Sequence, residues 1–376
     1  MSFEGRGGRL TIGRVWGIPI SVHLTWLLVF FLVTASLAGG YFPFLHPEWD
    51  AASRWALGAI TSLAFFACVL VHELGHSRVA LSNGIPIQDI TLFVFGGVAR
   101  ISREAASPGV EFRIAIAGPP TSLGLAALFA GLGTAAASVP FAAVPAWWLA
   151  RVNLLVALFN LLPGFPLDGG RVLRAAVWAK TGSFERADHM ASKTGEGLAL
   201  ALMAIGVLRA LGGDVGGGIW LALIGWFLQT AVAGGRAQAA LRDLLRGATA
   251  SQAMSRDCRA VAPDETLERL VQEEVLGAGR RCFVVAEGER LRGLLTLHEV
   301  KAVPRERWRS VRAEEIMKPA ASLTTVRPND GLFEALGKMA DASVAQMPVV
   351  EDGRWLGMLD REDIIHYMRV RAELVA

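Results

Sequence analysis

Six long apolar stretches in the first 235 residues restrict this chain more than any other feature of its sequence. Each approaches or exceeds the roughly 17–25 residues that a helix needs to cross a lipid bilayer. The stretches cover residues 18–38, 55–81, 110–137, 143–162, 197–211 and 217–233. The fifth is the shortest and ends beside Gly212 and Gly213. The sequence therefore predicts a polytopic α-helical membrane protein with about six spans.

The composition agrees, because 53% of the residues are hydrophobic and only 19% are charged. Soluble domains average about 45–50% apolar and about 25% charged residues. Residues 246–376 differ from the rest and have the charged composition of a soluble domain. The net charge of +3 is small and spread along the chain, so we expect no nucleic-acid partner. Three widely spaced cysteines without a C-x-x-C pair exclude a cysteine-type zinc site.

The basic residues indicate the orientation in the membrane. They gather before the first span (Arg6, Arg9, Arg14), after the second (Arg100, Arg103), between the fourth and fifth (Arg171, Arg174, Lys180, Arg186, Lys193) and after the sixth (Arg236, Arg242, Arg246). The opposite loops offer little beyond Arg54 and Arg209. The positive-inside rule then places both termini in the cytoplasm, as an even number of spans requires. The first span follows a basic segment and is long enough to be a retained anchor rather than a signal peptide.

Residues 85–101, between the second and third stretches, predict a short membrane-associated β segment. They are rich in Ile, Val, Phe and Thr and are interrupted by Gly96 and Gly97, which indicates two strands with a turn or bulge. Strand edges cannot face lipid with unsatisfied backbone groups. We therefore expect this segment to pack within protein, line a wet cavity or pair with another strand.

The charged tail contains an internal repeat, in which residues 254–304 align with residues 317–368. In each copy a Met is followed by a proline-led helix, an apolar strand, an acidic turn, a glycine-led strand and a closing amphipathic helix. This order resembles a tandem pair of α/β cystathionine-β-synthase-type (CBS) domains, a module that commonly binds adenosine nucleotides between its copies. The predicted domains are therefore residues 1–245, 246–308 and 309–376.

The CBS resemblance implies a carboxylate on the closing helix that holds the nucleotide ribose. Asp363 fits that place in the second copy, whereas the first copy has Glu299 there. At most one intact nucleotide site is implied, with Asp363 as its candidate residue. A purely structural or dimerising role, with a homodimer formed through the CBS domains, is an equally open alternative.

A metal-site motif stands inside the second apolar stretch, where His72 and His76 lie four residues apart with Glu73 beside them. On a helix this spacing places both imidazoles on one face, where they can bind one zinc ion. Glu73 can then act as the general base towards a water whose pKa zinc lowers from 15.7 to about 7. The alternative is a chance match or a structural histidine pair. Against it, Glu73 and Arg78 are the only charged residues in 55–81, and a carboxylate there costs about 2.5–3.5 kcal/mol.

Asp168 is the candidate for a third ligand. It follows a proline-broken apolar segment and precedes Gly169 and Gly170, which suits a carboxylate on irregular backbone facing a protein cavity. An N-cap for a helix that begins at Gly169 is the alternative role.

The HELGH motif in a span, followed by N-x-x-P-x-x-P-x-D-G-G from Asn160 onward, resembles the site-2 protease family of intramembrane metalloproteases. The resemblance implies that His72, His76 and Asp168 bind one Zn²⁺ and that Glu73 is the general base. It further implies that Asn160 stabilises the oxyanion or positions substrate, although an interhelical hydrogen bond would equally explain an asparagine there.

Two further segments carry this resemblance. The strands around Gly96 and Gly97 match the family's membrane-associated strands, where strand addition would present an extended substrate to the zinc. Residues 117–119 match a family motif in the third span, but Ser122 stands where many relatives carry asparagine, so no role is assigned to it.

The sequence thus predicts a zinc endopeptidase that cleaves transmembrane segments of membrane-tethered proteins. A single-span substrate, such as an anti-sigma factor or another membrane-tethered regulator, and a bacterial cell membrane are family-level expectations. His72 lies about 25 Å along its helix from Trp55, which places the zinc towards the cytoplasmic side. The alternatives are a CBS-regulated transporter or channel, and a catalytically silent zinc-binding scaffold.

Overall fold

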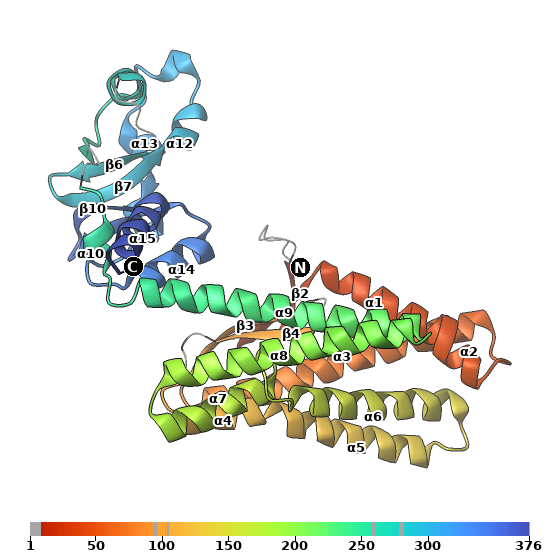
Figure 1. Cartoon of the computed structure of the whole chain (residues 1–376). Coiled ribbons are helices and arrows are strands. Elements are labelled where there is room, and N and C mark those ends of the chain that lie inside the picture. Colours follow the sequence, from red (N-terminus) through yellow and green to blue (C-terminus); the bar gives the residue numbers. More distant parts are fainter. Residues whose placement is uncertain are drawn as a thin grey trace. The chain divides into compact units, whose positions relative to one another are not determined.

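A computed structural model describes residues 9–93, 96–101, 103, 105–256, 260–277 and 282–375 of the chain. The chain divides into two compact units, Met1–Gly235 and Arg236–Ala376 (Figure 1). Each unit has its own buried apolar clusters.

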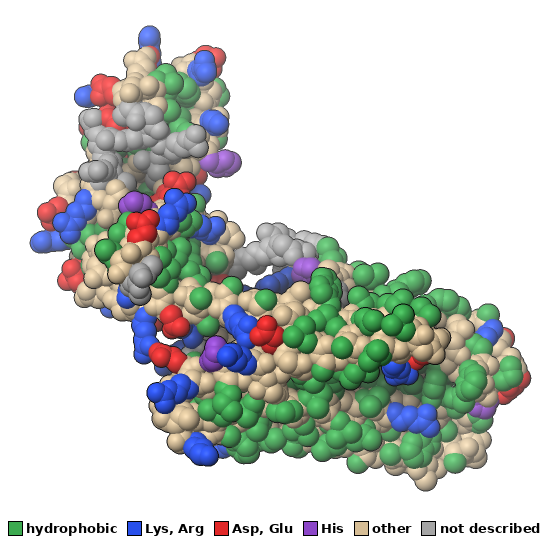
Figure 2. All heavy atoms as spheres, viewed as in Figure 1, with side chains coloured by type: hydrophobic (Ala, Val, Ile, Leu, Met, Phe, Trp, Pro, Cys, Tyr) green, Lys and Arg blue, Asp and Glu red, His purple; other side chains and the backbone are tan. Residues whose placement is uncertain are grey.

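In the described residues of the first unit, six helical segments are long and apolar enough to cross a membrane. They cover Thr25–Leu45, Ala51–Ser82, Pro108–Ala135, Pro140–Asn160, Phe184–Leu211 and Val215–Leu244, the last of which continues into the second unit. Large apolar side chains such as Leu155 and Trp220 stay exposed on them, and Figure 2 shows hydrophobic side chains spread widely over these helices. A lipid environment would cover such faces. The predicted polytopic helical architecture with six spans is confirmed.

The helices of this unit follow one another with short connections, except that residues 83–107 between the second and third spans contain two strands (Figure 1). They are α1 (Thr25–Ser36), a π-helical turn (Leu37–Tyr41), α2 (Phe42–Leu45), α3 (Ala51–Ser82), α4 (Pro108–Ile116), α5 (Gly118–Ala135), α6 (Pro140–Asn160), α7 (Asp168–Thr181), α8 (Phe184–Leu211) and α9 (Val215–Leu244). Helix α7 lies between the fourth and fifth spans.

Three of the predicted spans had wrong boundaries, the sixth because α9 continues past the expected end at residue 233 to Leu244. The first was expected at residues 18–38, but Ile18–His23 forms strand β2 and the helix begins only at Thr25. Alternating Ile18 and Ile20 are buried on one face, which is the period of a strand rather than of a helix. The fifth span was expected at 197–211, but α8 begins at Phe184. Its polar first half remains helical because small residues such as Ala187 and Ala191 pack inward.

A four-stranded sheet completes the unit. Its strands are β1 (Arg9–Val15), β2 (Ile18–His23), β3 (Ile87–Phe93) and β4 (Gly96–Ile101), in the spatial order β1-β2-β3-β4. Strands β2 and β3 are parallel, and the two outer pairs are antiparallel. The two strands predicted in residues 85–101 are confirmed, with Gly96 and Gly97 at the start of β4, and the expected pairing with another strand is made by β2. Ile20 and Ile90 pack against Leu70 and Leu74, which fixes the sheet on α3.

The second unit contains a mixed sheet in the order β5-β6-β7-β10-β9, with β8 (Lys318–Pro319) paired to β7. Its main elements are β5 (Ala260–Val261), β6 (Cys282–Glu287), β7 (Arg290–Thr296), α12 (Leu297–Lys301), α14 (Leu332–Ala342), β9 (Gln346–Glu351), β10 (Arg354–Asp360) and α15 (Arg361–Val375). Each copy of the repeat supplies a hairpin and a following helix, so the predicted α/β pair is confirmed.

The two copies exchange their opening segments. Ala248 and Ala250, at the start of the first copy, are buried in the core of the second. Ala313, at the start of the second copy, is buried in the core of the first. Each core therefore needs both copies, and the predicted division at residues 308/309 separates the copies in sequence but not the two cores.

Candidate metal centre

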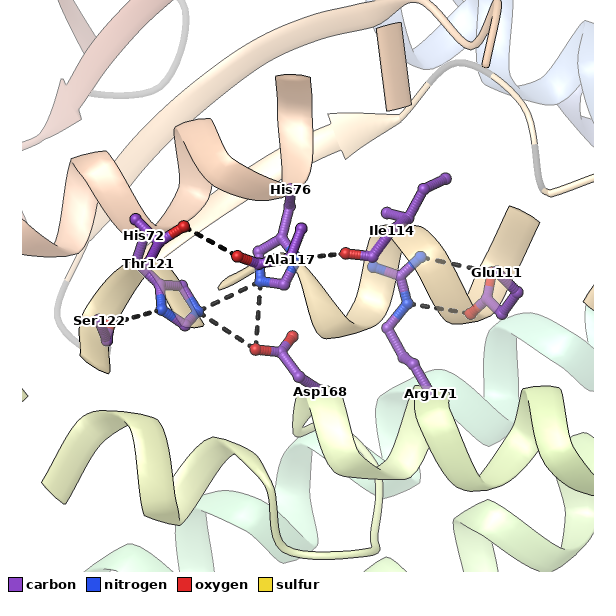
Figure 3. Close-up of polar contacts among 9 residues, drawn as sticks. All are labelled: His72, His76, Glu111, Ile114, Ala117, Thr121, Ser122, Asp168 and Arg171. Atoms are coloured by element: carbon purple, nitrogen blue, oxygen red, sulfur yellow. Dashed lines mark hydrogen bonds and ion pairs between the residues drawn. The ribbon is translucent and has the colours of Figure 1, made fainter. Parts of the chain in front are cut away.

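His72 and His76 lie on the same buried face of α3. Helix α3 begins after Asp50, whose carboxylate accepts a hydrogen bond from the Ser53 backbone N–H at 3.0 Å and so caps the first turn. The side chains of His72 and His76 are 5% and 8% exposed, and their Nε2 atoms are 3.2 Å apart. The four-residue spacing thus brings two imidazole nitrogens together inside the first unit, called the membrane unit below (Figure 3).

The Asp168 carboxylate meets this histidine pair from a different helix. Its Oδ2 atom lies 3.2 Å from Nε2 of His72 and 3.1 Å from Nε2 of His76 (Figure 3). Asp168 is the first residue of α7 and Leu167 occupies the N-cap position. The carboxylate therefore projects from a helix, not from the irregular backbone that the sequence suggested, and it is not the N-cap.

The glycines after Asp168 allow the chain to fold back closely before α7. A Cβ atom at Gly169 would overlap the carbonyl oxygen of Leu161, and one at Gly170 would overlap the backbone of Gly164. Only residues without a side chain permit this approach. The two glycines that follow Asp168 are therefore required by backbone packing.

Both imidazole rings are oriented through their Nδ1 atoms. Nδ1 of His76 donates to the carbonyl oxygen of Ile114 at 2.7 Å, so in the neutral ring Nε2 is the nitrogen that is free to bind a metal ion. Nδ1 of His72 shares a 2.8 Å hydrogen bond with Oγ of Ser122 (Figure 3). Sequence reasoning assigned no role to Ser122. The signal that could have found it was its place after residues 117–119, one helical turn beyond Gly118.

Gly118 gives the three donor atoms their space. A Cβ atom there would lie 2.5 Å from Nε2 of His72 and closer still to Nε2 of His76. The first residue of α5 therefore has to be glycine for both imidazoles to face Asp168.

The donor set fits a zinc ion. Three ligands at about 2.0–2.2 Å from zinc in a tetrahedral arrangement stand about 3.3–3.5 Å apart, close to the 3.1–3.2 Å separations here. Two imidazoles and one carboxylate also leave a fourth position open, as catalytic zinc sites require. Within the described ranges, His72, His76 and Asp168 form the single group of His, Cys, Asp or Glu side chains brought together in this way.

The Asp168 carboxyl, which lies outside the six spans, is held in its charged form. Burial by itself would raise the pKa of this group, but hydrogen bonding to His72 and His76 lowers that pKa to about 2. An ionised carboxylate is the form that binds a metal ion.

Glu73 follows His72 on α3 and lies against strand β4. A Cβ atom at Gly97 would be 2.6 Å from Cγ of Glu73, so the backbone of β4 passes directly over this carboxylate side chain. Gly96 has a φ of 122°, a conformation that favours glycine, and lies next to Val69 on α3. Of the two glycines predicted for substrate binding, Gly97 is thus beside the predicted general base and Gly96 is beside Val69, one turn earlier on α3.

The other predicted site residues lie apart from these contacts. Asn160 is the last residue of α6 and is partly exposed, and among the described residues it takes no part in the hydrogen bonds that join the donor atoms. Asp363 belongs to the second unit, where its carboxylate accepts a hydrogen bond from the Asp360 backbone N–H at 3.1 Å.

A buried ion-pair cluster beside the donor atoms was not foreseen. Glu111 on α4 is 2% exposed and pairs with Arg171 at 3.0 Å and Arg174 at 2.6 Å, both on α7. Arg174 also contacts Asp188 on α8 at 2.8 Å. The sequence reasoning used the two arginines only as markers of orientation, although a glutamate at the start of an apolar stretch indicates a buried partner.

Comparisons with known proteins identify the family of the chain. Residues 60–144 and 134–203 match Peptidase family M50, and residues 250–305 and 313–370 match the CBS domain. The protein sll0528 of Synechocystis, named as a zinc metalloprotease, is 35% identical over 370 residues, which cover 96% of each chain. Rip3 of Mycobacterium tuberculosis, named likewise, is 36% identical over 355 residues, covering 92% of this chain and 88% of that protein. A solved site-2 protease from Methanocaldococcus jannaschii is 28% identical and covers 60% of this chain and 94% of that one, with a TM-score of 0.43.

The chain belongs to peptidase family M50, the site-2 protease family, and carries a C-terminal pair of CBS domains. It is a zinc metalloprotease with a multi-pass membrane unit.

Proposed function

We propose that this enzyme cleaves within or beside the transmembrane segment of a membrane-tethered protein, with its zinc bound by His72, His76 and Asp168. The observation that carries the proposal is the meeting of three donor atoms within 3.2 Å of one another inside the membrane unit. A zinc ion there supplies a Lewis acid that polarises the scissile carbonyl and makes water acidic.

In this proposal Glu73 moves the proton. Its carboxylate takes a proton from the attacking water and later gives it to the nitrogen of the leaving amine. Its position beside His72 and under Gly97 supports this role, since water and substrate backbone would both be within its reach. Asn160 donates its side-chain amide to the developing oxyanion or to the substrate backbone.

Strand β4 presents the substrate. It is the last strand in the order β1-β2-β3-β4, so its outer edge can accept an added strand. Gly97 brings the backbone of β4 next to Glu73, so an extended peptide added to this strand would pass close to the site. A single-span helix would have to unfold locally to bind in this way, which fits a substrate such as an anti-sigma factor or another membrane-tethered regulator.

The proposed orientation places both termini in the cytoplasm of a bacterial cell. Basic residues lie at one end of the spans that carry the metal centre, in line with the positive-inside rule. Arg100 follows the second span, Arg113 is near the start of the third, and Arg174 follows the fourth. Cleavage then takes place towards the cytoplasmic side and releases a cytoplasmic product.

The CBS pair binds an adenosine nucleotide through Asp363 in this proposal. Its carboxylate, at the start of α15, already accepts a backbone hydrogen bond and is available to a ribose hydroxyl. Glu299 has the equivalent place on α12, but its carboxylate is paired with Lys318 and accepts a hydrogen bond from the Thr296 backbone N–H. ATP, ADP and AMP should raise the thermal unfolding temperature of the full chain, and no shift with any of them would leave a structural or dimerising role instead.

Exchanging Glu73 for Gln tests the proteolytic mechanism. The amide keeps the shape of the side chain but cannot accept the proton, so turnover of a single-span reporter in proteoliposomes should fall by about 10²–10⁴. Zinc content and thermal unfolding of the variant should match those of the unchanged enzyme. Retained cleavage by folded, zinc-loaded Glu73→Gln protein would refute the assignment.

A further inference from the structure

Helix α4 contacts both helices that carry the donor atoms. The carbonyl oxygen of Ile114 accepts the Nδ1–H of His76 on α3. One turn earlier, the Glu111 carboxylate binds Nε of Arg171 at 3.0 Å and Nη2 of Arg174 at 2.6 Å on α7. A single turn of α4 thus connects the two halves of the metal centre (Figure 3).

Arg171 lies three residues after Asp168, so the two side chains project from neighbouring turns on one side of α7. Glu111 is 2% exposed, and the arginine side chains are 22% and 13% exposed. A buried carboxylate without a cationic partner is strongly unfavourable, which resists any separation of α4 from α7.

We propose that Glu111 is a positioning residue that, through Arg171 and Arg174, holds α7 where Asp168 Oδ2 meets Nε2 of His72 and His76. The inference rests on the proposed role of Asp168 as a zinc ligand.

Helix geometry shows why such a tether is needed. A slip of α7 by one residue along its axis moves Asp168 by about 1.5 Å. A metal site tolerates ligand errors of only about 0.2 Å. The backbone from Leu161 to Leu167 is non-helical, so no continuous helix from α6 fixes the axial position of α7.

Zinc affinity separates a positioning role from an electrostatic one. Glu111→Gln removes a negative charge near the site and Arg171→Gln removes a positive charge. Electrostatics alone predicts weaker zinc binding in the first variant and tighter binding in the second. Loss of the tether predicts weaker binding in both, by about tenfold, as for other residues that orient metal ligands.

The experiment uses the full chain in nanodiscs, stripped of metal and titrated with zinc against a chromophoric chelator. Thermal unfolding identifies the folded variants. Asp188→Asn is the matched control, because it removes the other carboxylate from Arg174 and should leave zinc affinity unchanged. Asp168→Ala is the reference for a lost ligand and should weaken binding more than either tether variant.

If Glu111→Gln fails to fold, Arg171→Gln decides the question, since Glu111 keeps Arg174 as a partner there. Zinc affinity that is unchanged or raised in folded Arg171→Gln protein overturns the positioning role while leaving the proposed ligand set intact. Unchanged affinity in Asp168→Ala refutes the ligand set itself, and the inference with it.

Discussion

Replacing Gly118 by Ala adds one methyl group at the point where the structure has least room for it. Gly118 is the first residue of α5 and faces the two imidazoles of α3. The new Cβ atom would lie 2.5 Å from Nε2 of His72 and 2.6 Å from Cε1 of His76. These are the atoms that converge on Asp168, so the substitution acts directly on the metal centre.

The required displacement is larger than a metal site allows. Ordinary contact begins at 3.4 Å, so Nε2 of His72 has to move from 2.5 Å to at least that distance, a shift of about 0.9 Å. Zinc ligands tolerate about 0.2 Å. Overpacking itself costs about 1–3 kcal/mol. We therefore expect a folded protein of reduced stability whose zinc affinity is lower by about a hundredfold or more, beyond the range for residues that only orient ligands.

The assay measures zinc content after purification and zinc affinity by chelator competition, together with thermal unfolding. Gly124→Ala on the same helix is the matched control, because a Cβ atom there meets nothing within 4 Å. It should leave zinc binding and cleavage of a single-span reporter unchanged. Wild-type zinc affinity in Gly118→Ala protein would refute the geometry described for the metal centre.

Two further predictions concern Ser122 beside the metal centre and Asp89 in the four-stranded sheet. Ser122→Ala removes the hydrogen bond to Nδ1 of His72 and should lower zinc affinity by about 10–100-fold. Ser122→Asn keeps a polar group and should lower zinc affinity less. Equal zinc affinities in the unchanged enzyme and both variants would contradict the orienting role. Asp89→Asn should lower stability by about 1 kcal/mol at neutral pH, because Asp89 accepts hydrogen bonds from Thr91 and from Arg100, whose exposed side chain weakens the ion pair. Burial would raise the pKa of Asp89, but these partners hold it below its ordinary 3.8. The stabilisation is therefore complete above pH 3.8 and is lost as the pH falls through the lower folded pKa, so thermal unfolding curves of the two proteins should converge at acidic pH and not at basic pH.

Local patterns in the sequence were sufficient for much of the fold. Apolar length alone predicted six spans, and the number was confirmed even where the boundaries were wrong. The error at Ile18–His23 arose because an apolar run does not distinguish a strand from a helix until its partners are known. Here the partners are β1 and β3, which satisfy the backbone groups of β2.

The CBS pair shows the same division. The order of helices and strands in each copy followed from the repeat, and β6, β7, β9 and β10 were found where expected. The burial of Ala250 in one core and Ala313 in the other did not follow from it. Two similar copies leave open which opening segment completes which core, since both pairings bury the same kind of surface.

At the metal centre, the sequence by itself determined the pairing of His72 with His76, because four residues make about one turn of any helix. It could not place Asp168, which is 96 residues from His72 and reaches it only through the packing of α7 against α4. Nor could it show that Ser122 and Glu111 orient the two halves of the site. These contacts join residues on different helices, and the distance between helices is set by side chains that meet across the whole interface. Periodicity within one helix carries no information about that distance, so only the tertiary structure decided it.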